Sequence, residues 1–163
     1  MNKVVFARKI SSKITSVTIE NGVTTIGEDA FRYCTGLTSV TIAGGTTAIG
    51  DYAFSNCAKL VSIAIPESVV EIGSSAFYGC AALTSITIPS GVKKLDVGTF
   101  SGCAALESVT AAGVVKLEDG SEYYSTSGVF ASCSALTTLT LGSVEYVGSF
   151  AFYACKSLTE ISF

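Results

Sequence analysis

Six cysteines carry the most versatile chemistry in this chain, because a thiol can bridge to another thiol, bind a metal or act as a nucleophile. Successive cysteines are separated by 23, 23, 23, 30 and 22 residues. A zinc site typically draws its cysteines from close pairs such as CxxC, and no such pair occurs here. The regular spacing instead indicates a structural repeat with one cysteine in each unit. The six are Cys34, Cys57, Cys80, Cys103, Cys133 and Cys155.

Other catalytic and metal-binding patterns are missing from the 163 residues. The chain has no histidine, which removes the commonest general base and the commonest metal ligand. It has neither the GxSxG motif of a serine nucleophile nor a glycine-rich loop that would cradle a phosphate. Glu118, Asp119 and Glu122 could be considered for calcium, but their spacing does not match a calcium-binding loop. We therefore expect no enzymatic activity, no cofactor and no metal.

Charge and composition exclude two further classes of function. The net charge is −3 and the 10 basic residues are scattered, whereas a nucleic-acid-binding protein needs clustered Lys and Arg. No apolar run approaches the roughly 18 residues that a membrane-spanning helix needs. With 48% hydrophobic and only 14% charged residues, the chain has ample material for a core. The sequence therefore predicts a folded protein that does not bind nucleic acid and does not insert into a membrane.

The cysteine spacing belongs to a longer repeat that extends over most of the chain. Each cysteine follows a phenylalanine by three residues and precedes a leucine by three, and further apolar residues follow that leucine. The unit is AFxxCxxLxxIxI, followed by about ten residues that contain VxxIG. A first, partial unit begins at Ile14, Val17 and Ile19, which gives seven candidate strands. The phenylalanines are Phe31, Phe54, Phe77, Phe100, Phe130 and Phe152.

This pattern predicts a repeat solenoid in which each unit forms one coil. The last three positions of LxxIxI alternate between apolar and polar residues, as in a strand with one buried face. Stacked copies of this strand would give a right-handed parallel solenoid of about seven coils. We expect a short helical turn to direct the AF phenylalanine inward, and Gly27, Gly50, Gly73 and Gly148 to supply backbone freedom at a corner. The Cβ atoms of equivalent cysteines in neighbouring coils would lie about 4.8 Å apart, whereas those of a disulfide lie ~3.8 Å apart. We therefore predict that the cysteines are buried free thiols.

The residues CxxLxxIxIPxxVxxIGxxAFxxC resemble the BspA-like group of bacterial leucine-rich repeats, and the similarity covers residues 11–163. The resemblance implies a leucine-rich repeat domain with a parallel β-sheet and short helical or irregular turns. Residues 1–10 depart from the repeat and are interpreted as an N-terminal cap or an added leader. Members of this group are typically bacterial surface or secreted proteins that bind host or matrix proteins. The resemblance thus implies an extracellular or cell-surface location and a protein ligand, and it brings no catalytic residue with it.

The outward side of the predicted strands is the first candidate for a binding site. It carries a nearly uniform ladder of small hydroxyl residues. Such residues favour strands and can simply keep an exposed sheet soluble. A docking surface for a partner is the second interpretation, and an ordered array that matches ice or a polysaccharide is the third. In the central coils the ladder consists of Ser85, Thr87, Ser108 and Thr110.

The second candidate is the one interruption of the repeat. The unit between the fourth and fifth cysteines has 30 residues, and about eight extra ones fall within the segment 118–128, EDGSEYYSTSG. Insertions in repeat proteins emerge as loops on one face, often the binding face, and tyrosines offer large contact areas. We predict that this loop faces the partner, with a neutral surface loop as the alternative. Its acidic and aromatic residues are Glu118, Asp119, Glu122, Tyr123 and Tyr124.

Taken together, these features predict a non-catalytic protein-binding module of a bacterial surface or secreted adhesin. One alternative is a structural spacer in a larger surface protein, and another is a carbohydrate or ice binder that uses the Ser/Thr face. The last residue, Phe163, falls on a core position in mid-repeat. Two expectations follow from it: a fragment of a longer array, or self-association through the solenoid ends.

Overall fold

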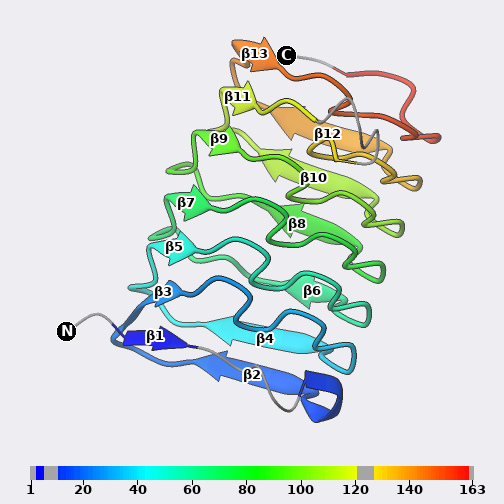
Figure 1. Cartoon of the computed structure of the whole chain (residues 1–163). Helices are drawn as coiled ribbons and strands as arrows, with labels where there is room; N and C mark the ends of the chain where they lie inside the picture. Colours follow the sequence, from blue (N-terminus) through cyan, green and yellow to red (C-terminus); the bar gives the residue numbers. More distant parts are fainter. Residues whose placement is uncertain (1–2, 6–10, 121–126, 162–163) are drawn as a thin grey trace.

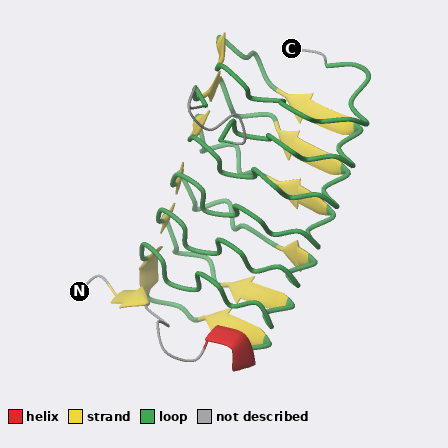
Figure 2. Ribbon diagram, turned by 45° about the vertical axis from the view of Figure 1, so that its right-hand side comes forward, coloured by secondary structure: helices red, strands yellow, loops and turns green. Residues whose placement is uncertain are grey.

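The computed structural model describes residues 3–5, 11–120 and 127–161. The chain winds as a stack of coils, with the N-terminus at one end of the stack and the C-terminus at the other (Figure 1). Its strands fall into two columns that are joined by turns, and helix is limited to one 3-10 turn within these described segments, η1 (Ser11–Lys13) (Figure 2). The predicted class, a repeat solenoid of parallel strands, is confirmed.

The LxxIxI segments form the first column of strands. In β4 (Ser39–Ile42), Val40 and Ile42 are buried while Ser39 and Thr41 are exposed, because successive side chains of a strand point to opposite faces. The register keeps equivalent residues side by side, as in the pairing of Thr41 with Thr18 of the preceding coil. The column consists of β2 (Ser16–Ile19), β4, β6 (Ser62–Ile63), β8 (Ser85–Thr87), β10 (Ser108–Ala111) and β12 (Thr138–Leu141).

Among the described residues, the first column has one strand fewer than predicted. Six of the seven expected strands form within the described residues, and over 158–161 the seventh segment is not a strand. A segment at the end of a column has a neighbour on one side only, so it has fewer pairing partners than an internal strand. The coil count thus differs slightly from the predicted seven, and the fold class is unaffected.

The first column is also interrupted, since β6 and β8 do not belong to the same sheet. After β4, the N–H of Ala43 continues the ladder by donating to the carbonyl of Ile19 in the preceding coil at 2.9 Å. Pro66 and Pro89 stand at the equivalent position in the next two coils, and proline has no N–H to donate. Pairing between β4 and β6 accordingly covers two residue pairs, whereas pairing between β2 and β4 covers four.

The VxxI segments, which the sequence indicates only as a return path, form the second column of strands. Ile49 lies between Ile26 and Ile72 in the register of this column. Near the N-terminus, β1 pairs with β3, and Val5 lies opposite Ile26. The column consists of β1 (Lys3–Val5), β3 (Val23–Ile26), β5 (Ala48–Ile49), β7 (Glu71–Ile72), β9 (Lys94–Leu95), β11 (Lys116–Leu117) and β13 (Tyr146–Val147).

The glycines that follow VxxI are needed for close contact between coils. Neither Gly50 nor Gly73 has a φ in the left-handed region. A Cβ on Gly50 would lie 2.8 Å from the backbone nitrogen of Glu28, and one on Gly73 would lie 2.6 Å from that of Asp51. The expectation that these residues supply backbone freedom at a corner is wrong, because what the position requires is the absence of a side chain.

The AF segments form a row of turns in place of the predicted helical turns. The N–H of Phe54 donates to the carbonyl of Ala76 in the next coil at 2.8 Å, whereas the N–H of Cys57 turns back to the Phe54 carbonyl at 3.2 Å. Tyr52 and Asn56, which flank Phe54, have left-handed φ values of 54° and 60°. A helix would keep all of these bonds local, so the alternation between local and inter-coil bonds excludes it.

The row of turns directs one phenylalanine of each coil into the core. Neighbouring rings are stacked, with centroids 5.4–5.7 Å apart and ring planes within 2–13° of each other. Phe54, Phe77 and Phe100 are fully buried. The predicted inward direction of the phenylalanines is confirmed, and they form one continuous aromatic column along the solenoid.

The cysteine thiols bind the backbone of the preceding coil. Cys80 and Cys103 each donate from Sγ at 3.2 Å to a phenylalanine carbonyl. All six cysteines are free, and five are buried while Cys155 is partly buried, which agrees with their prediction as small core residues. Burial raises the pKa of Cys80 to about 12 and that of Cys155 to about 11, from an ordinary value of 9.0. These thiols are therefore protonated and poor nucleophiles at neutral pH.

Candidate functional site

The outward face of the first column is a surface of exposed hydroxyl groups. Ser85, Thr87 and Thr110 are exposed, and Ser108 is partly exposed. The register places Ser108 beside Ser85 and Thr110 beside Thr87. The structure thus brings the four predicted strand-face residues together on β8 and β10.

A hollow of about 280 Å³ opens in this face where the column is interrupted. The break between β6 and β8 separates the two strands, so that isoleucines contribute to a surface that otherwise presents hydroxyl groups. The strand face is therefore less uniform than the sequence predicts. The lining residues are Ser62, Ile63, Ala64, Ile65, Ser85, Ile86 and Thr87.

The insertion leaves its coil and rejoins it at one point. The N–H of Gly120 donates to the carbonyl of Ser149 at 2.8 Å. A Cβ on Gly120 would lie 2.9 Å from the backbone nitrogen of Gly128, so the two stems of the insertion are adjacent. Glu122, Tyr123 and Tyr124, which we predict to contact a partner, lie outside the described residues.

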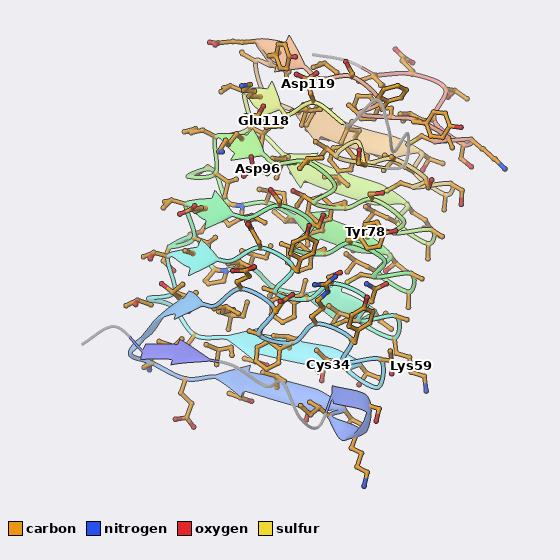
Figure 3. All side chains as sticks on the ribbon, in the orientation of Figure 1. Cys34, Lys59, Tyr78, Asp96, Glu118 and Asp119 are labelled. Carbon is orange, nitrogen blue, oxygen red and sulfur yellow. The ribbon has the colours of Figure 1, made fainter. Side chains whose placement is uncertain are left out.

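Glu118 and Asp119, the other two predicted loop residues, make contacts within the solenoid. Glu118 forms an ion pair with Lys116 at 3.0 Å. Asp119 accepts a hydrogen bond from the hydroxyl of Tyr146 at 2.6 Å and one from the N–H of Ser149 at 2.8 Å. The bond with Tyr146, followed by that with Ser149, lowers the pKa of Asp119, and the same bond with Asp119 raises the pKa of Tyr146. Both acidic residues lie along the second column of strands (Figure 3).

The contact made by Asp119 recurs elsewhere in the repeat. In an earlier coil, Asp51 accepts a hydrogen bond from the N–H of Ser74 at 2.8 Å. An aspartate at this corner therefore links one coil to the next through the backbone. The two acidic residues and the strand-face residues belong to different columns, and the structure does not bring these two parts of the predicted site together.

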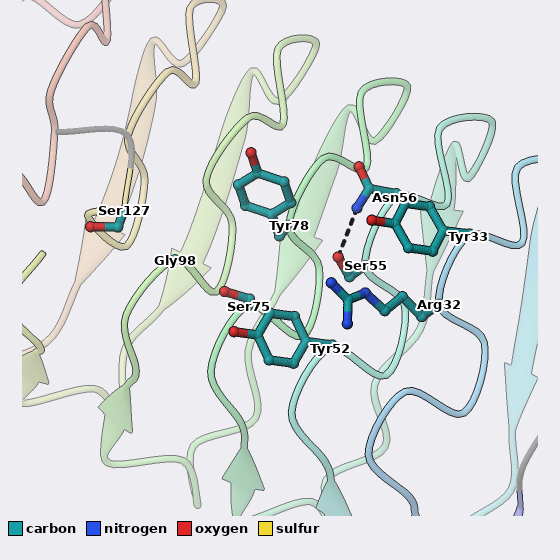
Figure 4. Close-up of a pocket in the computed structure, with 9 residues that line it drawn as sticks. All are labelled: Arg32, Tyr33, Tyr52, Ser55, Asn56, Ser75, Tyr78, Gly98 and Ser127. Carbon is teal, nitrogen blue, oxygen red and sulfur yellow. Dashed lines mark hydrogen bonds between the residues drawn. The ribbon is translucent and has the colours of Figure 1, made fainter. Parts of the chain in front are cut away.

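A pocket of about 280 Å³ in the row of turns was not predicted from the sequence (Figure 4). We call it the tyrosine–arginine pocket. Arg32 lies at one end of it, and its guanidinium is 4.6 Å from the ring centre of Tyr52 and 5.2 Å from that of Tyr33. The guanidinium also pairs with Asp29 at 3.0 Å. The full lining is Arg32, Tyr33, Tyr52, Ser55, Asn56, Ser75, Tyr78, Gly98 and Ser127.

The repeat pattern hides this pocket because its aromatic residues occupy different positions of the repeat. Tyr33 comes two residues after the phenylalanine of its coil, Tyr52 comes two before, and Tyr78 comes one after. No column of equivalent residues therefore contains more than one of them. Only the stacking of three coils in register brings the rings to one place.

The described part of the chain holds neither a grouped set of metal-binding side chains nor a membrane-spanning helix. Across residues 3–5, 11–120 and 127–161, no three His, Cys, Asp or Glu side chains are grouped so that they could hold a metal ion. The only helical element in these segments is η1, so none of their helices has the length and apolar character needed to cross a bilayer.

The stacked parallel strands, the LxxIxI spacing and the ladders of equivalent residues define a leucine-rich repeat solenoid. The chain matches the family described as BspA type leucine rich repeat region, in six copies, over residues 2–127 and 123–163. It belongs to this family. A comparison with curated proteins gave no match, and neither the family nor the solved structures indicate an enzyme.

Three solved bacterial structures are similar to this chain. The leucine-rich repeat protein of T. pallidum is 29% identical with a TM-score of 0.84, over 98% of this chain and 72% of that one. A leucine-rich repeat protein from Eubacterium ventriosum ATCC 27560 is 32% identical with a TM-score of 0.78, and the match covers 93% of this chain and 39% of that protein. A leucine rich cell surface protein from Faecalibacterium prausnitzii A2-165 is 28% identical with a TM-score of 0.53, and the match covers 92% of this chain and 48% of that protein. The chain thus spans less than half the length of the second and third relatives.

Proposed function

We propose that this chain is a non-catalytic protein-binding module of a bacterial surface or secreted protein, and that the insertion faces the partner. Its bacterial leucine-rich repeat family supports a repeat scaffold for protein interaction. A relative that is described as a leucine rich cell surface protein supports an extracellular or cell-surface location. A host or matrix protein is the proposed ligand, and self-association through the solenoid ends is a further proposal.

The observation that carries the proposal is the independence of the core from the insertion. The longer coil stacks like the others, because the rings of Phe100 and Phe130 lie 5.6 Å apart and those of Phe77 and Phe100 lie 5.4 Å apart. Cys133 donates to Phe100 at 3.1 Å, close to the 3.2 Å of Cys103 in a coil of ordinary length. The core does not require the extra residues, so a role outside the fold is their better explanation.

The geometry of the stems supports a role in binding. Gly120 and Gly128 are adjacent, so the residues between them can change without a shift in the coils on either side. Tyrosine is enriched among the residues that dominate interface energies, and Tyr123 and Tyr124 stand together in this segment. We therefore assign the main contact area to these two side chains. Because Glu118 and Asp119 are held by contacts within the solenoid, we assign them to the base of the loop.

The strand face is the competing surface for the same function. Its hydroxyl groups are exposed and in register, and the hollow adds Ile65 and Ile86 as apolar contacts. Serine and threonine are under-represented among the residues that dominate interface energies, which favours the insertion. The strand face remains the surface that a carbohydrate or ice binder would use, and a structural spacer would use neither surface.

A binding screen tests the proposed function. The purified chain, immobilised on a sensor surface, is exposed to a panel of extracellular matrix proteins and, separately, to polysaccharides. We expect saturable binding of at least one matrix protein, with competition by the soluble chain. If no protein binds and a polysaccharide does, the chain is a carbohydrate binder. If neither class binds, the structural spacer is the better explanation.

A further inference from the structure

The tyrosine–arginine pocket lies in the row of turns, away from the strand face, and it meets the insertion only at Ser127. Arg32 extends between Tyr33 and Tyr52, and Tyr78 lines the pocket from the following coil (Figure 4). The tyrosine rings come from three successive coils, and Gly98 and Ser127 add the next two, so the pocket exists only in the stacked solenoid. Its volume of about 280 Å³ is just below the ~300 Å³ at which pockets for drug-sized ligands begin, which suits a ligand of a single ring.

The charge of the pocket argues against an ionic ligand. A cationic ligand would compete with Arg32, which already lies over the faces of Tyr33 and Tyr52. An anionic ligand would compete with Asp29, which already pairs with the guanidinium at 3.0 Å. Arg32 and Asp29 cancel each other's charge, so the pocket favours a neutral ligand.

The remaining groups combine one open aromatic ring with hydroxyl and amide groups. Tyr78 is 38% exposed, and among the described residues no second ring or cation covers it. Asn56 donates from Nδ2 to the hydroxyl of Ser55 at 3.0 Å, a bond that fixes the amide and leaves its oxygen as an acceptor. The hydroxyl groups of Ser75 and Tyr52 add further donors and acceptors. A sugar ring has the matching chemistry: an apolar C–H face that stacks on an aromatic ring, and hydroxyl groups around its edge.

In the coils of the pocket, the left-handed positions of the turns carry tyrosine, asparagine and serine instead of glycine. Of the eight non-glycine residues with positive φ in the described chain, four line this pocket. An L-residue in this conformation is disfavoured, and glycine takes the equivalent positions in the next coils at Gly79, Gly98 and Gly102. The four that line the pocket are Tyr33, Tyr52, Asn56 and Ser75. The other four occupy the same two repeat positions outside the lining, so the turn itself belongs to the fold, and the pocket differs from the next coils in the side chains that these positions carry.

We propose that the tyrosine–arginine pocket binds one ring of a neutral glycan. Tyr78 is the stacking platform, and Asn56 and Ser75 bind the hydroxyl groups of the sugar. Arg32 holds Tyr33 and Tyr52 in place and presents its remaining N–H groups to the ligand. The pocket touches the insertion at Ser127 but none of the residues assigned to the sugar belongs to the insertion, so the Tyr78 variants test glycan binding independently of protein binding by the insertion.

Saturation-transfer NMR on the full chain tests this proposal. The probes are the methyl glycosides of glucose, galactose and N-acetylglucosamine, with methyl glucuronide as the anionic probe and tetramethylammonium as the cationic probe. We expect saturation of the ring C–H protons of at least one neutral glycoside, with millimolar affinity. Tyr78→Ala should weaken that affinity by about tenfold or more, whereas Tyr78→Phe, which keeps the ring, should retain it.

Tyr153→Ala is the matched control. Tyr153 occupies the same position of the repeat as Tyr78 and is 47% exposed, but it lies in the last coil, away from the pocket. This variant should bind the neutral glycoside as the parent does. The proposal is overturned if no neutral glycoside binds, if only methyl glucuronide or tetramethylammonium binds, or if Tyr78→Ala and Tyr153→Ala lose affinity equally.

Discussion

The thiol of Cys80 donates a hydrogen bond of 3.2 Å to the carbonyl oxygen of Phe54 in the preceding coil, and four further cysteines repeat this contact. The Phe54 carbonyl also accepts the N–H of Cys57 at 3.2 Å, so the thiol is a second donor to a buried carbonyl oxygen, which has two lone pairs. The cysteine thus fills a core position and binds the neighbouring backbone at the same time. Packing and this hydrogen bond together explain why each repeat has a cysteine before its strand, without a disulfide.

Thiol reactivity tests this role. We predict that a thiol reagent modifies Cys80 and the other buried cysteines only after denaturation, when all six should react. Cys155, which is partly buried, should be the first to react in the folded chain. The stoichiometry of modification before and after denaturation gives the result. Rapid modification of the central thiols, or an unreduced mass that lacks pairs of hydrogen atoms, would contradict the prediction.

The raised thiol pKa values predict a loss of stability at alkaline pH. Below pH 9.0, Cys80 is protonated in both the folded and the unfolded chain. Above it, the unfolded thiol ionises while the folded one keeps its proton until about pH 12, so the unfolded state gains stability. Each such thiol should lower the free energy of unfolding by up to about 1.4 kcal/mol per pH unit. Urea midpoints measured from neutral pH to about pH 11 should fall, and Cys80→Ala should make the fall shallower. A flat profile would show that the thiols are not desolvated.

The aromatic column predicts a large cost for a central truncation. Phe77 is fully buried between Phe54 and Phe100, so Phe77→Ala should lower the free energy of unfolding by about 3–5 kcal/mol. The control is Val70→Ala, at a residue that is 58% exposed, and it should change stability by no more than about 0.5 kcal/mol. Chemical denaturation measures both. Equal stability of the Phe77 variant and the parent would mean that the AF segment is not part of the core.

The left-handed turns predict opposite results for two substitutions at one position. Ser132 has a φ of 62°, and Gly79 and Gly102 occupy the equivalent position in other coils. Ser132→Gly should therefore keep stability within about 1 kcal/mol of the parent, since glycine adopts this φ without strain. Ser132→Val should lower it by about 1–3 kcal/mol, because a β-branched side chain is a poor fit there. Thermal melts that rank the two variants in the reverse order would contradict the turn geometry.

The ladders could be predicted from the sequence because each depends on one residue type at one spacing. The phenylalanine column and the buried thiols follow directly from AFxxC, and the exposed hydroxyl groups follow from strand alternation. The row of left-handed turns could not be predicted, because Tyr33 and Tyr52 are not residues that favour this conformation. The interruption after β6 was also missed, since the effect of Pro66 and Pro89 on pairing depends on their being adjacent in the stack.

The candidate site was harder to predict than the fold. The strand-face residues were found because they repeat, whereas the tyrosine–arginine pocket was missed because its residues do not. The position of Asp119 beside the insertion predicts a loop residue, yet its side chain accepts hydrogen bonds from Tyr146 and Ser149. A contact between coils separated by some thirty residues is not visible in the local sequence.

Removal of the insertion tests the central claim most directly. Deletion of residues 120–127 would join Asp119 to Gly128, whose backbone already lies against the start of the insertion, and would restore a unit of 22 residues. We predict nearly unchanged stability and a large loss of affinity for the matrix protein found in the screen. The double variant Tyr123→Ala and Tyr124→Ala should reproduce most of that loss. The claim is contradicted if the deletion variant binds like the parent while Thr87→Lys and Thr110→Lys abolish binding. That result would place the binding site on the strand face.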